Sequence, residues 1–91
     1  MSTSEYEPRI QARDVRFERN RLVVELVDGR AISVPLVWYP RLDRATAEQR
    51  RNWRLIGEGS GIHWPDVDED ISTIGLIEGW PSAEYGRAPT S

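Results

Sequence analysis

Residues 21–35 read RLVVELVDGRAISVP, two short apolar runs separated by an Asp-Gly pair. An Asp-Gly pair between alternating apolar residues is a strong signal for a β-hairpin. A two-residue turn would set the apolar face of the first run against small and polar residues of the second. A three-residue loop over 27–29, with Gly29 in a left-handed conformation, sets Val24 opposite Ile32 and keeps one face apolar. The stretch therefore predicts an antiparallel hairpin with a three-residue loop.

The sequence on either side extends this hairpin into a sheet. Val15 and Phe17 alternate with charged residues over 12–18, which indicates a half-buried strand before the hairpin. The Ile-His-Trp run at 62–64 alternates in the same way and predicts one short later strand. We therefore expect a small antiparallel sheet, made of an N-terminal three-strand meander plus a short later strand.

Two short helices are predicted from their capping signals. Thr46 and Gln49 form a capping box, which begins a helix that runs to about Arg54. Ser72 is suited to cap a second helix, which Gly79 ends. The apolar residues of this second helix are Ile74, Leu76 and Ile77. The expected fold class is α+β, with the sheet covered on one face by the two helices.

The chain has the size of one domain. Ninety-one residues bury roughly 60–65% of their unfolded surface, which leaves little room for a second core. We predict a single domain over 12–80, between a flexible N-terminal lead-in at 1–11 and a flexible tail at 81–91. No apolar run approaches the ~20 residues of a membrane-spanning helix, and no signal peptide is recognisable. We therefore expect a cytoplasmic protein without a membrane segment.

Two residue types are missing from the composition. The chain has no cysteine, which excludes disulfides, thiol catalysis and cysteine-based metal sites. It also has no lysine, so all 12 basic residues are arginine, and Schiff-base chemistry and a phosphate-loop lysine are excluded. No cofactor is predicted.

Charge is distributed unevenly along the chain. Residues 1–54 hold 11 arginines and 8 carboxylates, whereas residues 55–91 hold one arginine and 7 carboxylates. We expect the two halves to neutralise each other in the folded protein. The net charge of −3 has the wrong sign for a general polyanion binder, although a local arginine patch could still bind one.

Two stretches superficially resemble chemical sites. The GEGSG run at 57–61 lacks the strand–helix context and the lysine of a phosphate-binding loop, so a plain turn is expected. His63 precedes three aspartates within 66–70 that match the first ligands of a calcium loop, but Ile71 stands where that loop requires glycine. We interpret His63 as a strand residue and the acidic run as a solvated loop. Acid–base catalysis by His63 with one carboxylate is the alternative.

Arginines beside aromatic residues give the most specific functional signal. Four tryptophans exceed what a core of this size needs, so we expect some aromatic side chains at the surface. The predicted partner-binding residues are Trp38, Tyr39, Arg41, Arg50, Arg54 and Trp80. Arg50 and Arg54 would share one face of the predicted helix. Phosphate contacts by the arginines of helix 46–54 would instead indicate a nucleic-acid-associated module.

An ordered series of motifs covers residues from about 15 to 79. Its segments are the hairpin at 21–36, the Trp-Tyr-Pro-Arg-Leu run at 38–42, residues 45–53, the Ile-His-Trp-Pro run at 62–65, and the Asp-Glu-Asp-Ile-Ser run at 68–72. On these motifs the chain resembles the bacterial family called domain of unknown function 2442. The residues that match the family's most recognisable motif are His63, Trp64, Asp68, Glu69, Asp70 and Ser72.

The resemblance implies a small bacterial α+β protein without established catalytic residues. Members are sometimes fused to a helix-turn-helix domain, which we do not expect after residue 79 here. They are often encoded beside another small family, domain of unknown function 4160, in what looks like a toxin–antitoxin arrangement. The leading hypothesis is a non-enzymatic protein-binding module, antitoxin-like or regulatory, whose partner is a neighbouring small toxin-like protein. The alternatives are the nucleic-acid-associated module and a small inhibitor from a mobile element, and a homodimer could form through the exposed hairpin edge.

Overall fold

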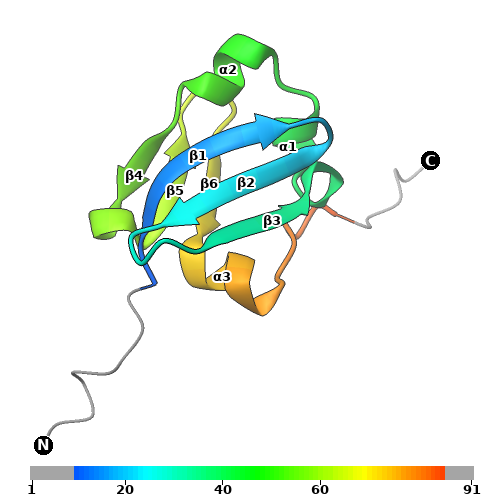
Figure 1. Cartoon of the computed structure of the whole chain (residues 1–91). Helices are drawn as coiled ribbons and strands as arrows, with labels where there is room; N and C mark the ends of the chain where they lie inside the picture. The colour runs from blue at the N-terminus through cyan, green and yellow to red at the C-terminus, as the bar shows by residue number, and fades with distance from the viewer. Residues whose placement is uncertain (1–9, 86–91) are drawn as a thin grey trace, which may run out of the picture.

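The computed structural model describes residues 10–85, which form two three-stranded antiparallel sheets and three short α-helices (Figure 1). The first sheet holds β1 (Ala12–Glu18), β2 (Arg21–Leu26) and β3 (Ala31–Pro35), and the second holds β4 (Arg54–Ile56), β5 (Gly61–Trp64) and β6 (Glu69–Ser72). The helices are α1 (Pro40–Asp43), α2 (Ala47–Arg51) and α3 (Thr73–Glu78), with 3₁₀ turns η2 (Leu36–Trp38) and η3 (Gly57–Gly59). The α+β class is confirmed. Within the described range, no helix is long and apolar enough to cross a membrane.

The β2–β3 hairpin has the predicted register. Val24 pairs with Ile32, and the Leu26 amide donates a 2.7 Å hydrogen bond to the carbonyl of Arg30. The three residues between them form the loop, in which Gly29 has a φ of 97°. A left-handed residue at the third loop position is typical of this kind of hairpin.

The core lies between the two sheets, which pack face to face (Figure 1). Leu22 and Val24 enter it from the first sheet, and Ile62 and Trp64 enter it from the second. The predicted layering of helices on one sheet face is therefore wrong, because the second sheet occupies that face. The helices are too short to cover it, and α2 has no buried residue at all.

The second sheet contains two strands that the sequence patterns did not reveal. The capping box of Thr46 and Gln49 is confirmed, with both reciprocal hydrogen bonds formed. The helix that it begins nevertheless ends at Arg51 rather than near residue 54, and the chain continues as β4. The GEGSG run therefore joins two strands instead of a helix and a strand. The end of the expected acidic loop forms β6, in which Glu69 and Ile71 are buried.

The described part of the chain continues past residue 80. The Ser82 amide donates a 3.0 Å hydrogen bond to the Trp38 carbonyl, and the ring centroids of Trp38 and Tyr85 lie 6.5 Å apart. Residues 81–85, expected to begin a flexible tail, therefore lie against η2. The expectations for the remaining ends of the chain fall outside residues 10–85.

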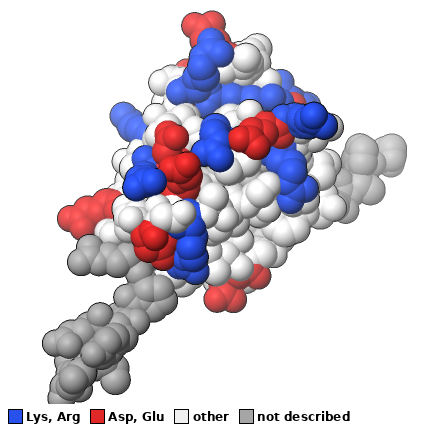
Figure 2. Space-filling view, in the orientation of Figure 1, with Lys and Arg blue, Asp and Glu red and all other residues white. Residues whose placement is uncertain are grey.

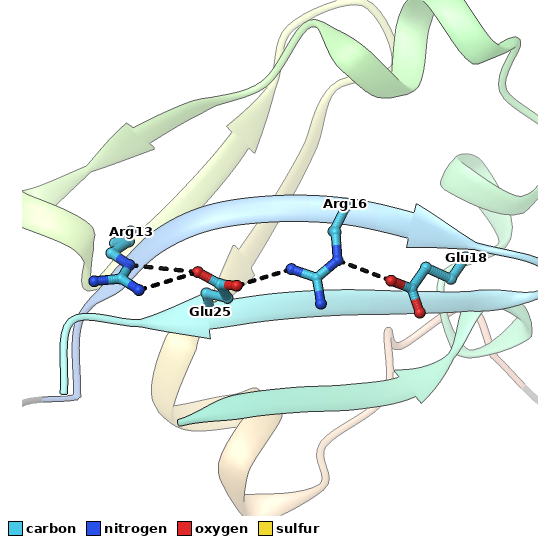
Figure 3. Close-up of polar contacts among 4 residues, drawn as sticks. All are labelled: Arg13, Arg16, Glu18 and Glu25. Atoms are coloured by element: carbon cyan, nitrogen blue, oxygen red, sulfur yellow. Dashed lines mark hydrogen bonds and ion pairs between the residues drawn. The ribbon is translucent and has the colours of Figure 1, made fainter. Parts of the chain in front are cut away.

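A row of ion pairs covers the outer face of the first sheet (Figure 3). Arg13 and Arg16 donate to Glu25 at 3.2 and 3.0 Å, and Arg16 also donates to Glu18 at 2.8 Å. The hydrogen bond from Arg16, followed by that from Arg13, lowers the pKa of Glu25. These partners all belong to the N-terminal half. The expected neutralisation between halves is thus mostly wrong, because Arg41 alone among the described arginines pairs with carboxylates of the C-terminal half.

Candidate partner-binding surface

Four of the six residues predicted to bind a partner are brought together by the segment that follows α3. The Tyr39 hydroxyl donates to the carbonyl of Trp80 at 3.5 Å, and Arg41 forms an ion pair with Glu84 at 3.1 Å. Trp38 is held by the backbone hydrogen bond to the same segment. Residues 38–41 and residues 80–84 are about forty positions apart in the sequence, and the fold makes the two segments neighbours.

Exposure separates the three aromatic residues of this group. The Trp80 residue is 59% exposed, Tyr39 is 2% exposed, and Trp38 is half-buried against the core. Burial, followed by the nearby negative charge of Glu69, raises the pKa of Tyr39 to about 12. Tyr39 is therefore a core residue and is not available to a partner, which corrects its assignment as a binding residue.

Trp80 is positioned by the cap at the end of α3. Gly79 has a φ of 84° and ends the helix, and the Trp80 amide then donates to the Gly75 carbonyl at 2.8 Å. The indole ring turns back onto the helix, so a β-carbon at Gly75 would lie only 3.3 Å from it. The Trp80 bond is the 6→1 bond of a Schellman cap, and the Gly79 amide donates to the same carbonyl at 2.9 Å, as in the simpler left-handed cap.

Two isoleucines of α3 are exposed as well as Trp80. Ile74 is 47% exposed and Ile77 is 37% exposed, whereas Leu76 is buried. We call Ile74, Ile77 and Trp80 the α3 surface. Figure 2 shows a broad area without charged side chains over β3 and α3. The exposed apolar side chains of the α3 surface lie in this uncharged region of the fold, and groups of exposed apolar side chains mark interaction sites.

The spacing of the apolar residues in α3 already indicates which of them are exposed and which is buried. Ile74 and Leu76 are two positions apart, which places them on nearly opposite sides of a helix. If one of them is in the core, the other faces solvent. The spacing from Leu76 marks Ile74 as a surface candidate, and Ile77, three positions after Ile74, shares its side of the helix.

The Arg41 side chain connects three segments of the chain. Its guanidinium donates to the carbonyl of Asp68 at 2.7 Å and pairs with Glu84, so it joins α1 to the β5–β6 turn and to the last described segment. Glu69 lies beside this network and is only 8% exposed. Burial raises the pKa of Glu69, although the charge of Arg41 opposes the shift.

Ionised Glu69 is therefore expected to destabilise the fold at neutral pH. Because the folded-state pKa lies above the ordinary value of 4.5, the folded protein holds the proton to higher pH than the unfolded chain does. The resulting stability is present below this window and is lost as the pH rises through it. Glu69→Gln should raise the melting temperature at pH 7, and the gain should disappear below about pH 4. Thermal unfolding at both pH values measures this, with Glu78→Gln as an exposed control. A lower melting temperature for Glu69→Gln at pH 7 would contradict it.

The two remaining predicted binding residues lie elsewhere. The Arg50 guanidinium donates to the carbonyls of Leu42 and Asp43 at 2.9 and 2.8 Å, which closes the end of α1. Arg54 is exposed on β4, where it pairs in register with His63. The two arginines therefore do not share a helix face, because α2 ends before residue 54.

The residues of the predicted family motif contribute to the core, to a turn, to a helix cap and to the pairing of β5 with β6. Trp64 is fully buried, Asp68 takes a left-handed conformation in the β5–β6 turn with a φ of 55°, and the Ser72 hydroxyl caps α3 by accepting from Gly75 at 3.2 Å. His63 and Asp70 are paired across β5 and β6, and their side chains are in contact. No group of three or more histidine, aspartate or glutamate side chains within residues 10–85 is arranged to hold a metal ion.

Comparison with known proteins identifies relatives of this fold. A crystal structure of a protein of unknown function from Rhodospirillum rubrum is 29% identical, with 86% of this chain and 96% of that chain covered and a TM-score of 0.71. A solution NMR structure of an uncharacterized protein from Chromobacterium violaceum is 28% identical, with 91% and 76% covered and a TM-score of 0.70. A search of curated proteins gives no match.

The family resemblance seen in the sequence is confirmed by a match to the family model over most of the chain. The profile described as "Protein of unknown function (DUF2442)" matches residues 12–82. That range includes all six strands and α3 with its capping residues. The chain belongs to the DUF2442 family of proteins of unknown function.

Proposed function

We propose that this protein is a small, non-enzymatic, cytoplasmic module that docks a protein partner through the α3 surface. The partner is the small toxin-like protein encoded beside it, which gives this chain an antitoxin-like or regulatory role. The observation that carries the proposal is the 59% exposure of Trp80 at the end of α3, a helix that also exposes Ile74 and Ile77.

The geometry of Trp80 suits it to be the centre of an interface. Tryptophan is among the residues most often found as energetic hot spots at protein interfaces. Its backbone is fixed by the cap at Gly79, and its ring rests on Gly75, so little conformational freedom remains to be lost on binding. Glu78, two positions before Trp80 in the sequence, is exposed and could contribute to a polar rim.

A docking mode based on strand pairing is less favourable. The alternation of an antiparallel ladder leaves the backbone groups of Ser33 on the open side of β3. Arg21 donates to the Ser33 carbonyl at 3.1 Å, and Pro35 has no amide to offer. Both features obstruct the addition of a strand along this edge. They argue against a homodimer through the hairpin edge and leave the α3 surface as the better docking site.

Trp80→Ala is expected to weaken the complex with the neighbouring toxin-like protein by about 30-fold or more, because hot-spot tryptophans contribute at least ~2 kcal/mol. Calorimetric titration of the two purified proteins measures the affinity. Val27→Ala is the matched control, since Val27 is 42% exposed but lies in the β2–β3 loop. It should bind like the wild type.

Cell growth provides a second readout. Expression of the neighbouring protein should arrest growth, and co-expression of the wild-type chain or Val27→Ala should restore it, whereas Trp80→Ala should not. Equal affinities for all three chains would move the docking site away from the α3 surface. Absence of any complex at micromolar concentrations would reject the antitoxin-like role.

A further inference from the structure

A second surface feature lies at the opposite end of the fold from α3. A pocket of about 470 Å³ opens between β1 and α2, which Figure 1 places far from α3. We call it the α2 pocket. Its lining combines apolar side chains, chiefly Val15, Phe17 and Trp53, with the arginines Arg19, Arg50 and Arg51. Val15 is buried, Phe17 and Trp53 are half-buried, and Arg19 and Arg51 are exposed, so the pocket has an apolar base and a cationic rim.

Carboxylates of the described residues neutralise only part of the positive charge of the α2 pocket. Within residues 10–85, Arg19, Arg50 and Arg51 have no carboxylate partner, whereas Arg16, which also borders the pocket, is paired with two glutamates. The Arg50 guanidinium is fixed by two carbonyls and lies 5.6 Å from the centre of the Phe17 ring. Figure 2 shows basic side chains gathered over α2 and near the end of β1. The protein therefore has a local cationic site despite its net charge of −3.

The backbone at Arg19 provides an independent observation. Arg19 is the first of two residues that connect β1 to β2, and its φ is 55°. Glycine and asparagine adopt this left-handed conformation most readily, and other residues do so at an energetic cost. An arginine held in a strained turn beside a pocket points to a use for its side chain.

We propose that the α2 pocket binds a nucleotide unit. Arg19 and Arg51 would contact the phosphate, because guanidinium groups match phosphate oxygens in geometry and charge. Trp53 and the fixed guanidinium of Arg50 offer flat surfaces on which a base can stack. An inorganic phosphate would leave the apolar base of the pocket unused, and an acidic side chain has no flat ring to place there. The unit could come from a free mononucleotide or from single-stranded nucleic acid.

The test is a calorimetric titration of the full chain at about 50 mM salt, where phosphate contacts are strongest. The probes are adenosine monophosphate, single-stranded hexaadenylate, inorganic phosphate and a hexaglutamate peptide. Hexaadenylate or adenosine monophosphate should bind more tightly than the other two probes. Binding of hexaadenylate more than tenfold tighter than the monophosphate identifies a nucleic-acid strand as the source, and equal binding identifies a free nucleotide.

Two variants test the residues. Arg51→Gln should weaken binding by about tenfold and reduce its salt dependence. Arg19→Gly should weaken binding similarly while leaving the melting temperature unchanged or higher, because it relieves the turn. Arg44→Gln, an exposed arginine outside the pocket, is the control. The proposal fails if no nucleotide probe binds, if phosphate or hexaglutamate binds as tightly, or if Arg44→Gln weakens binding as much as Arg51→Gln.

Discussion

Trp64→Ala is expected to lower the free energy of unfolding by about 3–5 kcal/mol, the cost of removing a large aromatic ring from a tight core. Trp64 is fully buried between the two sheets. Its ring meets Phe17 edge to face at 6.3 Å between centroids, and its indole nitrogen donates to the Arg50 carbonyl at 3.0 Å. The variant loses packing and leaves that carbonyl without its donor, so both effects act in the same direction.

Chemical denaturation and thermal unfolding measure the effect, which should lower the melting temperature by roughly 15 °C or more in a domain of this size. Trp64→Phe keeps a ring but removes the donor, and should fall between the wild type and Trp64→Ala. Trp80→Ala removes the same side chain at an exposed position and should cost far less. Similar losses for Trp64→Ala and Trp80→Ala would mean that Trp64 does not hold the sheets together.

The parts of the fold that were predictable are those in which local pattern and tertiary structure agree. The hairpin register followed from the Asp-Gly pair and the apolar alternation around Val24, because a one-residue slip would turn the apolar face to solvent. The caps at Thr46 and Ser72 followed from side chains that satisfy free amides within one turn. Each signal depends on residues only a few positions apart.

Strands β4 and β6 of the second sheet could not be predicted, because their local sequence patterns do not match their tertiary surroundings. In β6 the inward positions are Glu69 and Ile71, so a buried carboxylate stands where an apolar residue marks a strand. The three residues of β4 are all exposed and show no alternation. Such strands are stabilised by pairing with β5, which depends on tertiary structure and leaves no local period in the sequence.

The candidate surfaces, too, were predictable only in the features that depend on composition or local pattern. A surplus of tryptophans predicted an exposed aromatic residue, and Trp80 is one. Composition could not distinguish Trp80 from Tyr39, because burial depends on tertiary structure: Tyr39 packs in the core, whereas Trp80 lies at the surface after α3. The α2 pocket joins Phe17 of β1 to Trp53, 36 positions later in the chain, and nothing local connects them.

Gly59→Ala is expected to cost about 3 kcal/mol or more, from backbone strain and steric overlap together. Gly59 has a φ of 94°, and a β-carbon there would lie 2.6 Å from the carbonyl oxygen of Ala12 and 3.0 Å from its nitrogen. These are backbone atoms of β1, which cannot move aside as a flexible side chain would. The Gly59 carbonyl also accepts a 2.7 Å hydrogen bond from the buried hydroxyl of Thr73. Gly59 therefore lies where η3 contacts both β1 and α3.

Gly29→Ala separates the two contributions. Gly29 has nearly the same φ, 97°, but a β-carbon there would meet nothing within 4 Å. It should therefore lose only the conformational part, about 1–2 kcal/mol. Denaturant unfolding of both variants under one set of conditions gives the difference, which measures the overlap with Ala12. If Gly59→Ala is no less stable than Gly29→Ala, the close approach of η3 to β1 does not constrain the fold. A clear excess shows that η3 can lie this close to β1 only because position 59 has no side chain.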